Sequence, residues 1–170
     1  MEAVRQHNWP VRVTQGYSGY GVVAIRELGI GELVCRFDGP CVAFADIPLS
    51  ELRHALWIDS DRWMIPSAPA RFINHGCEPN CVLGEDPTDA DACVVIATRP
   101  IASGEEITFA YDRIDAEEWR AHCGDPLYAW HPSWSFDCRC GAPSCRGRVD
   151  GYRIVERGTL APDLGSRQRT

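Results

Sequence analysis

The stretch RFINHGCEPNC, from Arg71 to Cys81, decides how the rest of the sequence is interpreted. Asn74 and His75 stand next to each other in it, and two cysteines, Cys77 and Cys81, follow within a few residues. Amide, imidazole and thiol groups bind metals or satisfy buried polar atoms, and an ordinary surface loop has no need of all three. The stretch therefore indicates a site in the middle of the chain.

Length and cysteine content set the class of protein. The 170 residues are enough for one compact domain with a buried core and a small appendage. No apolar run is long enough to span a membrane, and the opening MEAVRQHNWP lacks the apolar segment of a signal peptide. We therefore expect a soluble intracellular protein without a membrane partner. In a reducing compartment, nine cysteines favour a metal site over a disulfide framework.

The charge balance limits the partners. The formal net charge is −7, and all 17 basic residues are arginine because the chain contains no lysine. A GC-rich genome explains the absence of lysine most simply. The acidic balance argues against direct nucleic-acid binding and fits a basic protein partner.

Short apolar segments separated by glycine and proline turns predict a mostly β fold. The expected strands cover residues 11–15, 22–25, 33–37, 57–59, 62–65, 93–98 and 105–111. A helix is expected around LSELRHAL (49–56), a turn or two of helix in 68–75, and a capping-box helix start at 115–119. The acidic segment 84–92 is expected to be an exposed loop.

The strongest metal signal is CRCGAPSC, which holds Cys138, Cys140 and Cys145. A tetrahedral zinc site needs four ligands, so one ligand must come from elsewhere in the chain. From the residues alone, the candidates for the fourth ligand are Cys77, Cys81, Cys123 and His131.

Two other motifs are weak signals when each is taken alone. The glycine-rich turn GYSGYG (16–21) would let the backbone approach a ligand closely, but a flexible hairpin has the same composition. Tyr111 ends the apolar segment EEITFAY, where a core tyrosine is the usual interpretation.

Taken together, the motifs resemble a known family. SGYGVVA, GIGELVCRFDG, ARFINHGCEPNC, GEEITFAYD and CRCGAPSCRG occur in the order and approximate spacing of SET-domain protein lysine methyltransferases with a post-SET zinc motif. The resemblance implies small curved sheets, and a pseudoknot in which the C-terminal strand passes through a loop near the Asn–His pair. It also implies a SET domain at 11–112, a connecting segment at 113–133, a post-SET zinc motif at 134–150 and a tail at 151–170.

The resemblance implies a role for each motif residue. Tyr111 would be the catalytic tyrosine, Phe109 would influence how many methyl groups fit, and Phe37 would line the lysine channel. The zinc ligands would be Cys77, Cys138, Cys140 and Cys145. The residues implied to bind S-adenosylmethionine are Ser18, Gly19, Tyr20, Gly21, Arg71, Asn74 and His75.

The implied activity is methyl transfer to a lysine of a basic protein, most naturally a histone tail, with a nuclear or chromatin location in that case. Three positions depart from the family pattern: Phe37 replaces a common tyrosine, Pro40 a glutamate and Gly76 a serine. The first two leave an alternative open, namely a catalytically inactive SET module that serves as a zinc-stapled scaffold. A purely structural zinc protein would leave the Asn–His pair unexplained.

Overall fold

The computed structural model describes residues 8–16, 19–58, 62–89, 92–111 and 135–149. The expected helix start at 115–119, the connecting segment 113–133 and the tail 151–170 lie outside these residues. Within them the chain forms short strands and two 3₁₀ helices. The strands are β1 (Val11–Gly16), β2 (Gly19–Ala24), β3 (Leu33–Phe37), β4 (Cys41–Ala43), β5 (Leu56–Trp57), β6 (Arg62–Met64), β7 (Asn74–His75), β8 (Cys81–Glu85), β9 (Cys93–Ala97), β10 (Thr108–Phe109), β11 (Phe136–Asp137) and β12 (Arg148–Val149).

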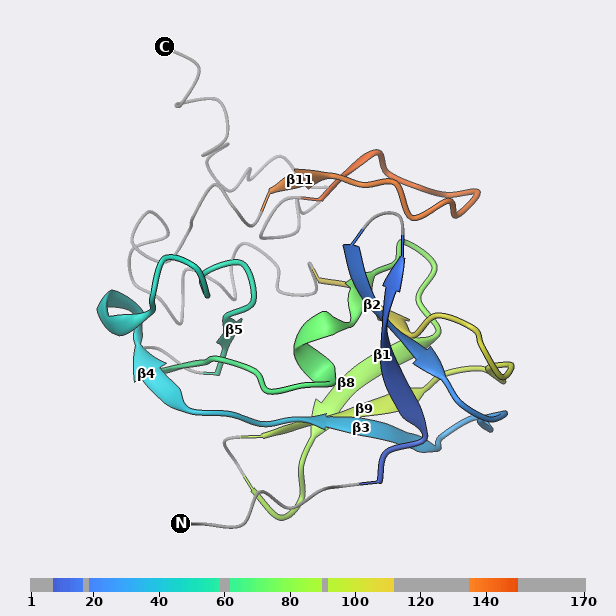
Figure 1. The fold of residues 1–170 in the computed structure, drawn as a ribbon, viewed down its shortest axis with the longest axis horizontal. Helices are drawn as coiled ribbons and strands as arrows, with labels where there is room; N and C mark the ends of the chain where they lie inside the picture. Colours follow the sequence, from blue (N-terminus) through green and yellow to red (C-terminus); the bar gives the residue numbers. More distant parts are fainter. Residues whose placement is uncertain (1–7, 17–18, 59–61, 90–91, 112–134, 150–170) are drawn as a thin grey trace, which may run out of the picture.

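The strands form several small sheets, which confirms the expected mostly β fold with few short helices. β1 and β2 form an antiparallel hairpin, and β11 and β12 form another near the end of the described chain. Two three-stranded sheets have the orders β3–β9–β8 and β4–β6–β5. In Figure 1 the β1–β2 hairpin extends towards the β11 segment, drawn in orange, while β4 and β5 lie on the opposite side of the molecule from the hairpin.

The main core lies between the β1–β2 hairpin and the β3–β9–β8 sheet. Alternate residues of β2 point inward, so that Val22 is fully buried and Ala24 almost so. In β3 the neighbours Val34 and Cys35 are both fully buried, because a register shift between Leu33 and Cys35 interrupts the alternation. The core also contains Leu28, Phe37, Met64, Ile73, Cys81, Val95, Ile101, Ile107 and Phe109.

The expected helix at 49–56 is wrong, because residues 49–54 form turns and β5 begins at Leu56. The Ala55 N–H donates to the Glu51 carbonyl with α-helical spacing, whereas the His54 N–H donates to the same carbonyl and the Glu51 N–H to the Pro48 carbonyl with the spacing of turns. Leu52 is buried, but Leu49 is 86% exposed, so the segment has too narrow an apolar face to hold a short helix against the core. The expected turn of helix in 68–75 is present as η2 (Ala70–Phe72).

A short parallel ladder brings the two most informative motifs together. β7 pairs with β10 in the register Asn74 to Thr108 and His75 to Phe109. Parallel neighbours need a long crossover, and here β8 and β9 lie between the two strands in the sequence. The Asn–His pair therefore lies beside the strand that leads into Tyr111, as the expected pseudoknot requires.

The buried side chain of Asn80 stabilises the β7–β10 pairing by hydrogen bonds to the β10 segment. Its side chain is 1% exposed, and its Nδ2 donates to the Glu106 carbonyl oxygen at 2.7 Å. Its Oδ1 accepts from the Thr108 N–H at 2.9 Å. A buried amide satisfied on both sides in this way ties the loop after β7 to the β10 segment.

Candidate functional site

Asn74 connects three segments at the site. Its Nδ2 donates to the Tyr20 carbonyl oxygen at 3.0 Å and to Glu106 Oε1 at 2.8 Å. The amide thereby joins β2, β7 and the turn before β10. This cross-link holds the glycine hairpin against the Asn–His pair.

Glu106 is a site residue to which the sequence analysis assigned no role. A Cβ atom at Gly21 would lie 2.8 Å from Glu106 Oε1 and 3.2 Å from Asn74 Nδ2, so a larger residue would displace these side chains from their present positions. Glu106 stands within the quoted GEEITFAYD motif, but nothing in one sequence distinguishes it from an ordinary surface glutamate. Ser18 of the same hairpin lies outside the described residues.

The Thr108 side chain closely approaches Gly76. Its N–H donates to the Phe109 carbonyl oxygen at 3.1 Å. A Cβ atom there would lie 2.8 Å from Thr108 Oγ1 and 3.0 Å from Thr108 Cβ, and a short β-branched side chain has little room to move. Glycine at this position therefore lets β10 pack closely on the Asn–His loop.

Three aromatic residues that the resemblance singled out lie together. The ring centroids of Phe37 and Phe109 are 5.6 Å apart, and those of Phe109 and Tyr111 are 4.8 Å apart. Phe37 and Phe109 are buried. The Tyr111 hydroxyl donates to the Ile73 carbonyl oxygen at 2.6 Å.

The hydroxyl of Tyr111 is in a less polar environment than the exposure of the whole residue suggests. The side chain counts as 42% exposed, but its oxygen is hydrogen-bonded against the backbone just before β7. Burial raises the pKa of Tyr111 well above its ordinary value, and the nearby Glu106 carboxylate acts in the same direction. At neutral pH this hydroxyl is therefore a hydrogen-bond donor and not a base.

Arg71 is oriented towards a partner that the sequence did not reveal. Its guanidinium donates to Glu51 Oε2 at 2.8 Å and lies 5.4 Å from the centre of the Phe72 ring. Phe72 in turn packs on Tyr20, with ring centroids 5.2 Å apart, and Tyr20 remains 54% exposed. The Tyr20–Phe72 pair forms a partly exposed aromatic surface next to Asn74. The Arg71 guanidinium, held by Glu51, packs against the Phe72 ring of this pair.

The four expected zinc ligands converge. The sulfur atoms of Cys77, Cys138, Cys140 and Cys145 all lie within 4.8 Å of one another, and those of Cys77 and Cys138 are 3.7 Å apart. Zinc–sulfur bonds of about 2.3 Å in a tetrahedron separate the sulfurs by about 3.8 Å, so the donor set fits zinc. Cys81 is buried in the main core instead, and the other two candidates, Cys123 and His131, lie outside the described residues.

The electrostatics of the cluster also suit a divalent cation. Backbone N–H groups of Cys77 and Ala142 lower the pKa of Cys140 to about 6, whereas burial raises the pKa of Cys138 to about 12. Burial therefore favours the neutral thiol at Cys138, and a thiolate there would need a positive partner such as a metal ion. Gly141 makes the tight turn of this loop possible with a φ of +75°.

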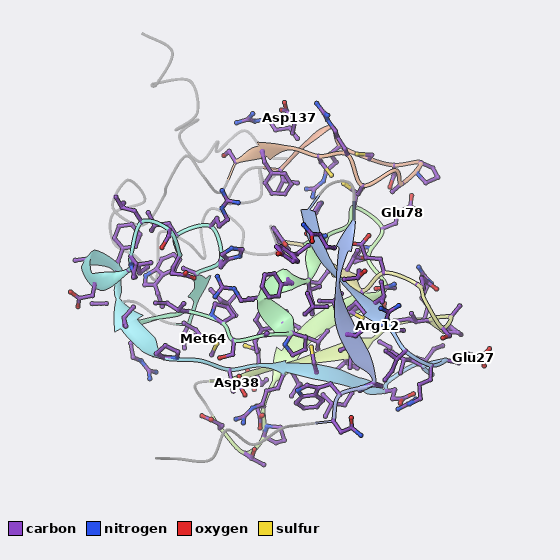
Figure 2. The ribbon with its side chains drawn as sticks, in the orientation of Figure 1. Arg12, Glu27, Asp38, Met64, Glu78 and Asp137 are labelled. Carbon is purple, nitrogen blue, oxygen red and sulfur yellow. The ribbon has the colours of Figure 1, made fainter. Side chains whose placement is uncertain are left out.

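A polar pocket of about 310 Å³ lies between the Asn–His loop and the cysteine loop. Glu78 fixes one wall, because its Oε1 accepts from the N–H and the hydroxyl of Ser144 at 3.2 and 2.7 Å. In Figure 2 Glu78 lies below the hairpin that carries Asp137. The pocket lining comprises His75, Gly76, Glu78, Asn80, Arg99, Glu105, Glu106, Thr108, Cys140, Gly141 and Ala142.

The sequence profile of the SET domain matches residues 19–112, which is more than half of the chain. The chain belongs to the SET-domain family. The SET match ends one residue after Tyr111, and the cysteine loop at 138–145 lies beyond it. Within the described residues, no helix is long and apolar enough to cross a membrane.

Relatives of this SET domain are larger proteins. The histone-lysine N-methyltransferase ash1 of Drosophila melanogaster is 28% identical over 148 residues, covering 78% of this chain and 6% of ash1. The histone-lysine N-methyltransferase Su(var)3-9 of the same species is 30% identical over 155 residues, covering 78% of this chain and 23% of the relative. The chain thus spans less than a quarter of the length of these relatives.

A solved structure supports the SET fold independently. A Plasmodium falciparum protein named as a candidate histone methyltransferase superposes with a TM-score of 0.53. The match covers 63% of this chain and 96% of the other at 16% identity. This likeness concerns the fold alone.

The cysteine cluster leads to a prediction about metal binding. We expect the metal-free chain to bind a single zinc ion, and Cys77→Ser to bind it about 100-fold more weakly or worse, because a tetrahedral site loses one of its ligands. Cys93→Ser is the matched control, since Cys93 is a half-buried thiol of β9 outside the cluster. Competition with a chromophoric chelator measures both affinities, and equal affinities for the two variants would contradict the assignment.

Proposed function

We propose that this SET domain transfers a methyl group from S-adenosylmethionine to a lysine side chain of a basic protein segment, such as a histone tail. The observation that carries the proposal is the β7–β10 pairing, which brings Asn74 and Tyr111 to one side of the fold next to the cysteine loop. The names of the curated relatives support the reaction class.

The proposed donor site lies along the Gly19–Gly21 hairpin, Asn74 and the adjoining pocket. S-adenosylmethionine carries a methyl group activated by a positively charged sulfur, together with an ammonium group. The carboxylates of Glu78, Glu105 and Glu106 line the pocket together with Arg99, which pairs with Glu105 at 2.7 Å, so the lining keeps a negative balance that attracts a cationic ligand. The exposed Tyr20 ring next to Asn74 offers a surface for stacking.

The proposed acceptor channel is bounded by Phe37, Phe109 and Tyr111. Methyl transfer needs a neutral amine in line with the methyl group, so alignment and exclusion of water are the main tasks of the protein. The Tyr111 hydroxyl and the Ile73 carbonyl would orient the amine by hydrogen bonds. Because that hydroxyl stays protonated, the ammonium would lose its proton to water before the transfer. Phe109 carries no hydroxyl to hold a water in the channel, which favours more than one methyl group.

The cysteine cluster would hold zinc and close the site. The proposed ligands join the Asn–His loop, through Cys77, to the loop from Cys138 to Cys145, so the metal would fix one wall of the pocket. We accordingly infer a SET domain at 11–112 and a post-SET zinc motif at 134–150.

The second candidate is a catalytically inactive SET scaffold, and Phe37 and Pro40 favour it. Both residues make contacts within the folded chain. Phe37 is buried and packs on Phe109, and the Pro40 carbonyl oxygen accepts a hydrogen bond from the Ile65 N–H at 2.9 Å. A buried Phe37 keeps the channel wall apolar without removing Tyr111, so the enzyme remains the preferred proposal.

The test is a methyl-transfer assay with isotopically labelled S-adenosylmethionine and a panel of basic proteins that includes histones. We expect label on lysine, located by mass spectrometry. The assay has a low background because the chain itself contains no lysine to methylate. Transfer to none of the proteins, with or without donor binding, would refute the enzyme and favour the scaffold.

A further inference from the structure

Glu106 places an unbalanced negative charge beside the proposed donor site. Its Oε1 accepts from Asn74 Nδ2 at 2.8 Å, and a Cβ atom at Gly21 would lie 2.8 Å from the same oxygen, so the carboxylate lies against the glycine hairpin. Among the residues that the structure describes, no arginine pairs with Glu106, whereas the neighbouring Glu105 pairs with Arg99 at 2.7 Å. The charge of Glu105 is therefore balanced within the chain, and that of Glu106 is available to a cationic ligand.

The Asn74 amide next to this carboxylate offers a ligand only an acceptor. Its Nδ2 donates to the Tyr20 carbonyl oxygen at 3.0 Å and to Glu106 Oε1, which uses both of its N–H bonds. A flipped amide would turn Oδ1 towards two acceptor oxygens, so these contacts fix its orientation. The exposed Asn74 side chain has only Oδ1 left for a ligand. Acceptor oxygens beside a negative charge fit a cation and do not fit an anion.

The charge of Glu106 also reaches the place where the two proposed substrates would meet. Burial raises the pKa of Tyr111, and the Glu106 carboxylate is the second cause that raises it. The Tyr111 hydroxyl lies at the proposed acceptor channel, where it donates to the Ile73 carbonyl oxygen at 2.6 Å. The field of one carboxylate therefore covers both the donor side and the channel side of the proposed site.

We propose that Glu106 is a specificity-determining residue that selects the donor, with its positively charged sulfur, over the product, with its neutral sulfur. The inference rests on the proposed donor site and deepens it. S-adenosylmethionine and S-adenosylhomocysteine share their ammonium, carboxylate and adenosine groups and differ in the methyl group and the charge of the sulfur. A carboxylate attracts the charged sulfur and not the neutral one. Because the sulfur loses its charge when the methyl group leaves, the same residue holds the donor and favours release of the product.

The experiment compares the affinities of the two ligands in the wild-type chain and in variants. Isothermal titration calorimetry measures Kd for each ligand, and the ratio of the two values cancels the contributions of the groups that the ligands share. Glu106→Gln keeps an oxygen that can accept from Asn74 Nδ2 and removes the charge. We expect it to reduce the preference for the charged donor by about 10-fold, because an attraction between opposite charges in a partly hydrated site is lost.

Glu106→Asp is the matched variant, because it keeps the charge and withdraws the carboxylate from Asn74 by one methylene group. We expect it to retain the preference to within about 3-fold. A role confined to the Asn74 hydrogen bond predicts the reverse order, with Glu106→Gln close to wild type and Glu106→Asp impaired. Glu27→Gln controls for the net charge, since Glu27 is exposed at the outer edge of the molecule (Figure 2), and it should leave the ratio unchanged.

The outcomes separate this inference from the enzymatic proposal. An unchanged ratio in folded Glu106→Gln, or a larger loss in Glu106→Asp than in Glu106→Gln, would overturn the inference and leave the enzyme standing. A wild-type chain that binds neither ligand would overturn it together with the donor site. A chain that shows the expected ratios but transfers no methyl group would support the inference and refute the enzyme.

The melting temperature shows whether the variants fold, and the wild-type chain decides if Glu106→Gln does not. Its preference for the charged donor should narrow by about 3-fold as salt rises from about 0.05 M to about 0.5 M, because ions screen the attraction. A preference that stays constant over this range would overturn the inference.

Discussion

Tyr111→Phe is expected to reduce methyl transfer by about 100-fold or more while the chain stays folded. The substitution removes one oxygen, which donates to the Ile73 carbonyl at 2.6 Å and faces the proposed channel. Misplacement of a reacting amine by about 1 Å is enough for a loss of that size. The ring contacts with Phe109 and His75 remain, because phenylalanine keeps the same ring.

Two measurements distinguish a chemical role of Tyr111 from a structural one. Loss of a single hydrogen bond should cost about 1 kcal/mol of unfolding free energy, which lowers the melting temperature by about 2–4 °C. Donor affinity, measured by calorimetry, should stay within about 3-fold, since the proposed donor contacts lie along the Gly19–Gly21 hairpin and Asn74. Unfolding of the variant would mean that Tyr111 is a core residue, and full activity would remove it from the mechanism.

Gly39→Ala is expected to destabilise the fold by about 3 kcal/mol or more. A Cβ atom at Gly39 would overlap the carbonyl oxygen of Ile65 and lie 3.3 Å from the Pro66 Cα, and both of these are backbone atoms that cannot rotate away. Relief requires the segment after β3 to move away from the segment after β6. Because Gly39 follows Phe37 by two residues, the same movement would disturb the proposed channel.

Gly29→Ala is the matched control for this substitution. A Cβ atom at Gly29 would meet no atom within 4 Å, so the exchange tests only the general effect of replacing glycine by alanine. Urea denaturation of the two variants measures the difference in unfolding free energy. Similar midpoints for both would show that the close approach of Gly39 to Ile65 is relieved without cost.

The order of local motifs was enough to predict five of the twelve described strands and three of the four clustered cysteines. Five of the predicted strand segments overlap β1, β2, β3, β6 and β9, because alternation of apolar residues is a local property of the sequence. The second of these was predicted too short, since β2 begins at Gly19, inside the expected glycine turn at 16–21. The chemistry of zinc, which needs four ligands, indicated that one ligand must join Cys138, Cys140 and Cys145 from elsewhere in the chain, and the family resemblance selected Cys77 among the candidates. The segment at 105–111 was predicted too long, and only Thr108–Phe109 is a strand there.

Other features depend on contacts between distant segments, which no local pattern records. Some apolar residues of the 49–56 segment have the spacing of a helix, but the folded chain buries Leu52 and leaves Leu49 exposed. The segment therefore forms turns. Arg71 pairs with Glu51, and Glu106 meets Asn74 beside Gly21, only because the folded chain places them together. The sequence by itself determined the residue types and hence the chemistry of the site. The tertiary structure alone decided which of those residues meet, since the parallel β7–β10 pairing joins segments that the whole β8–β9 unit separates along the chain.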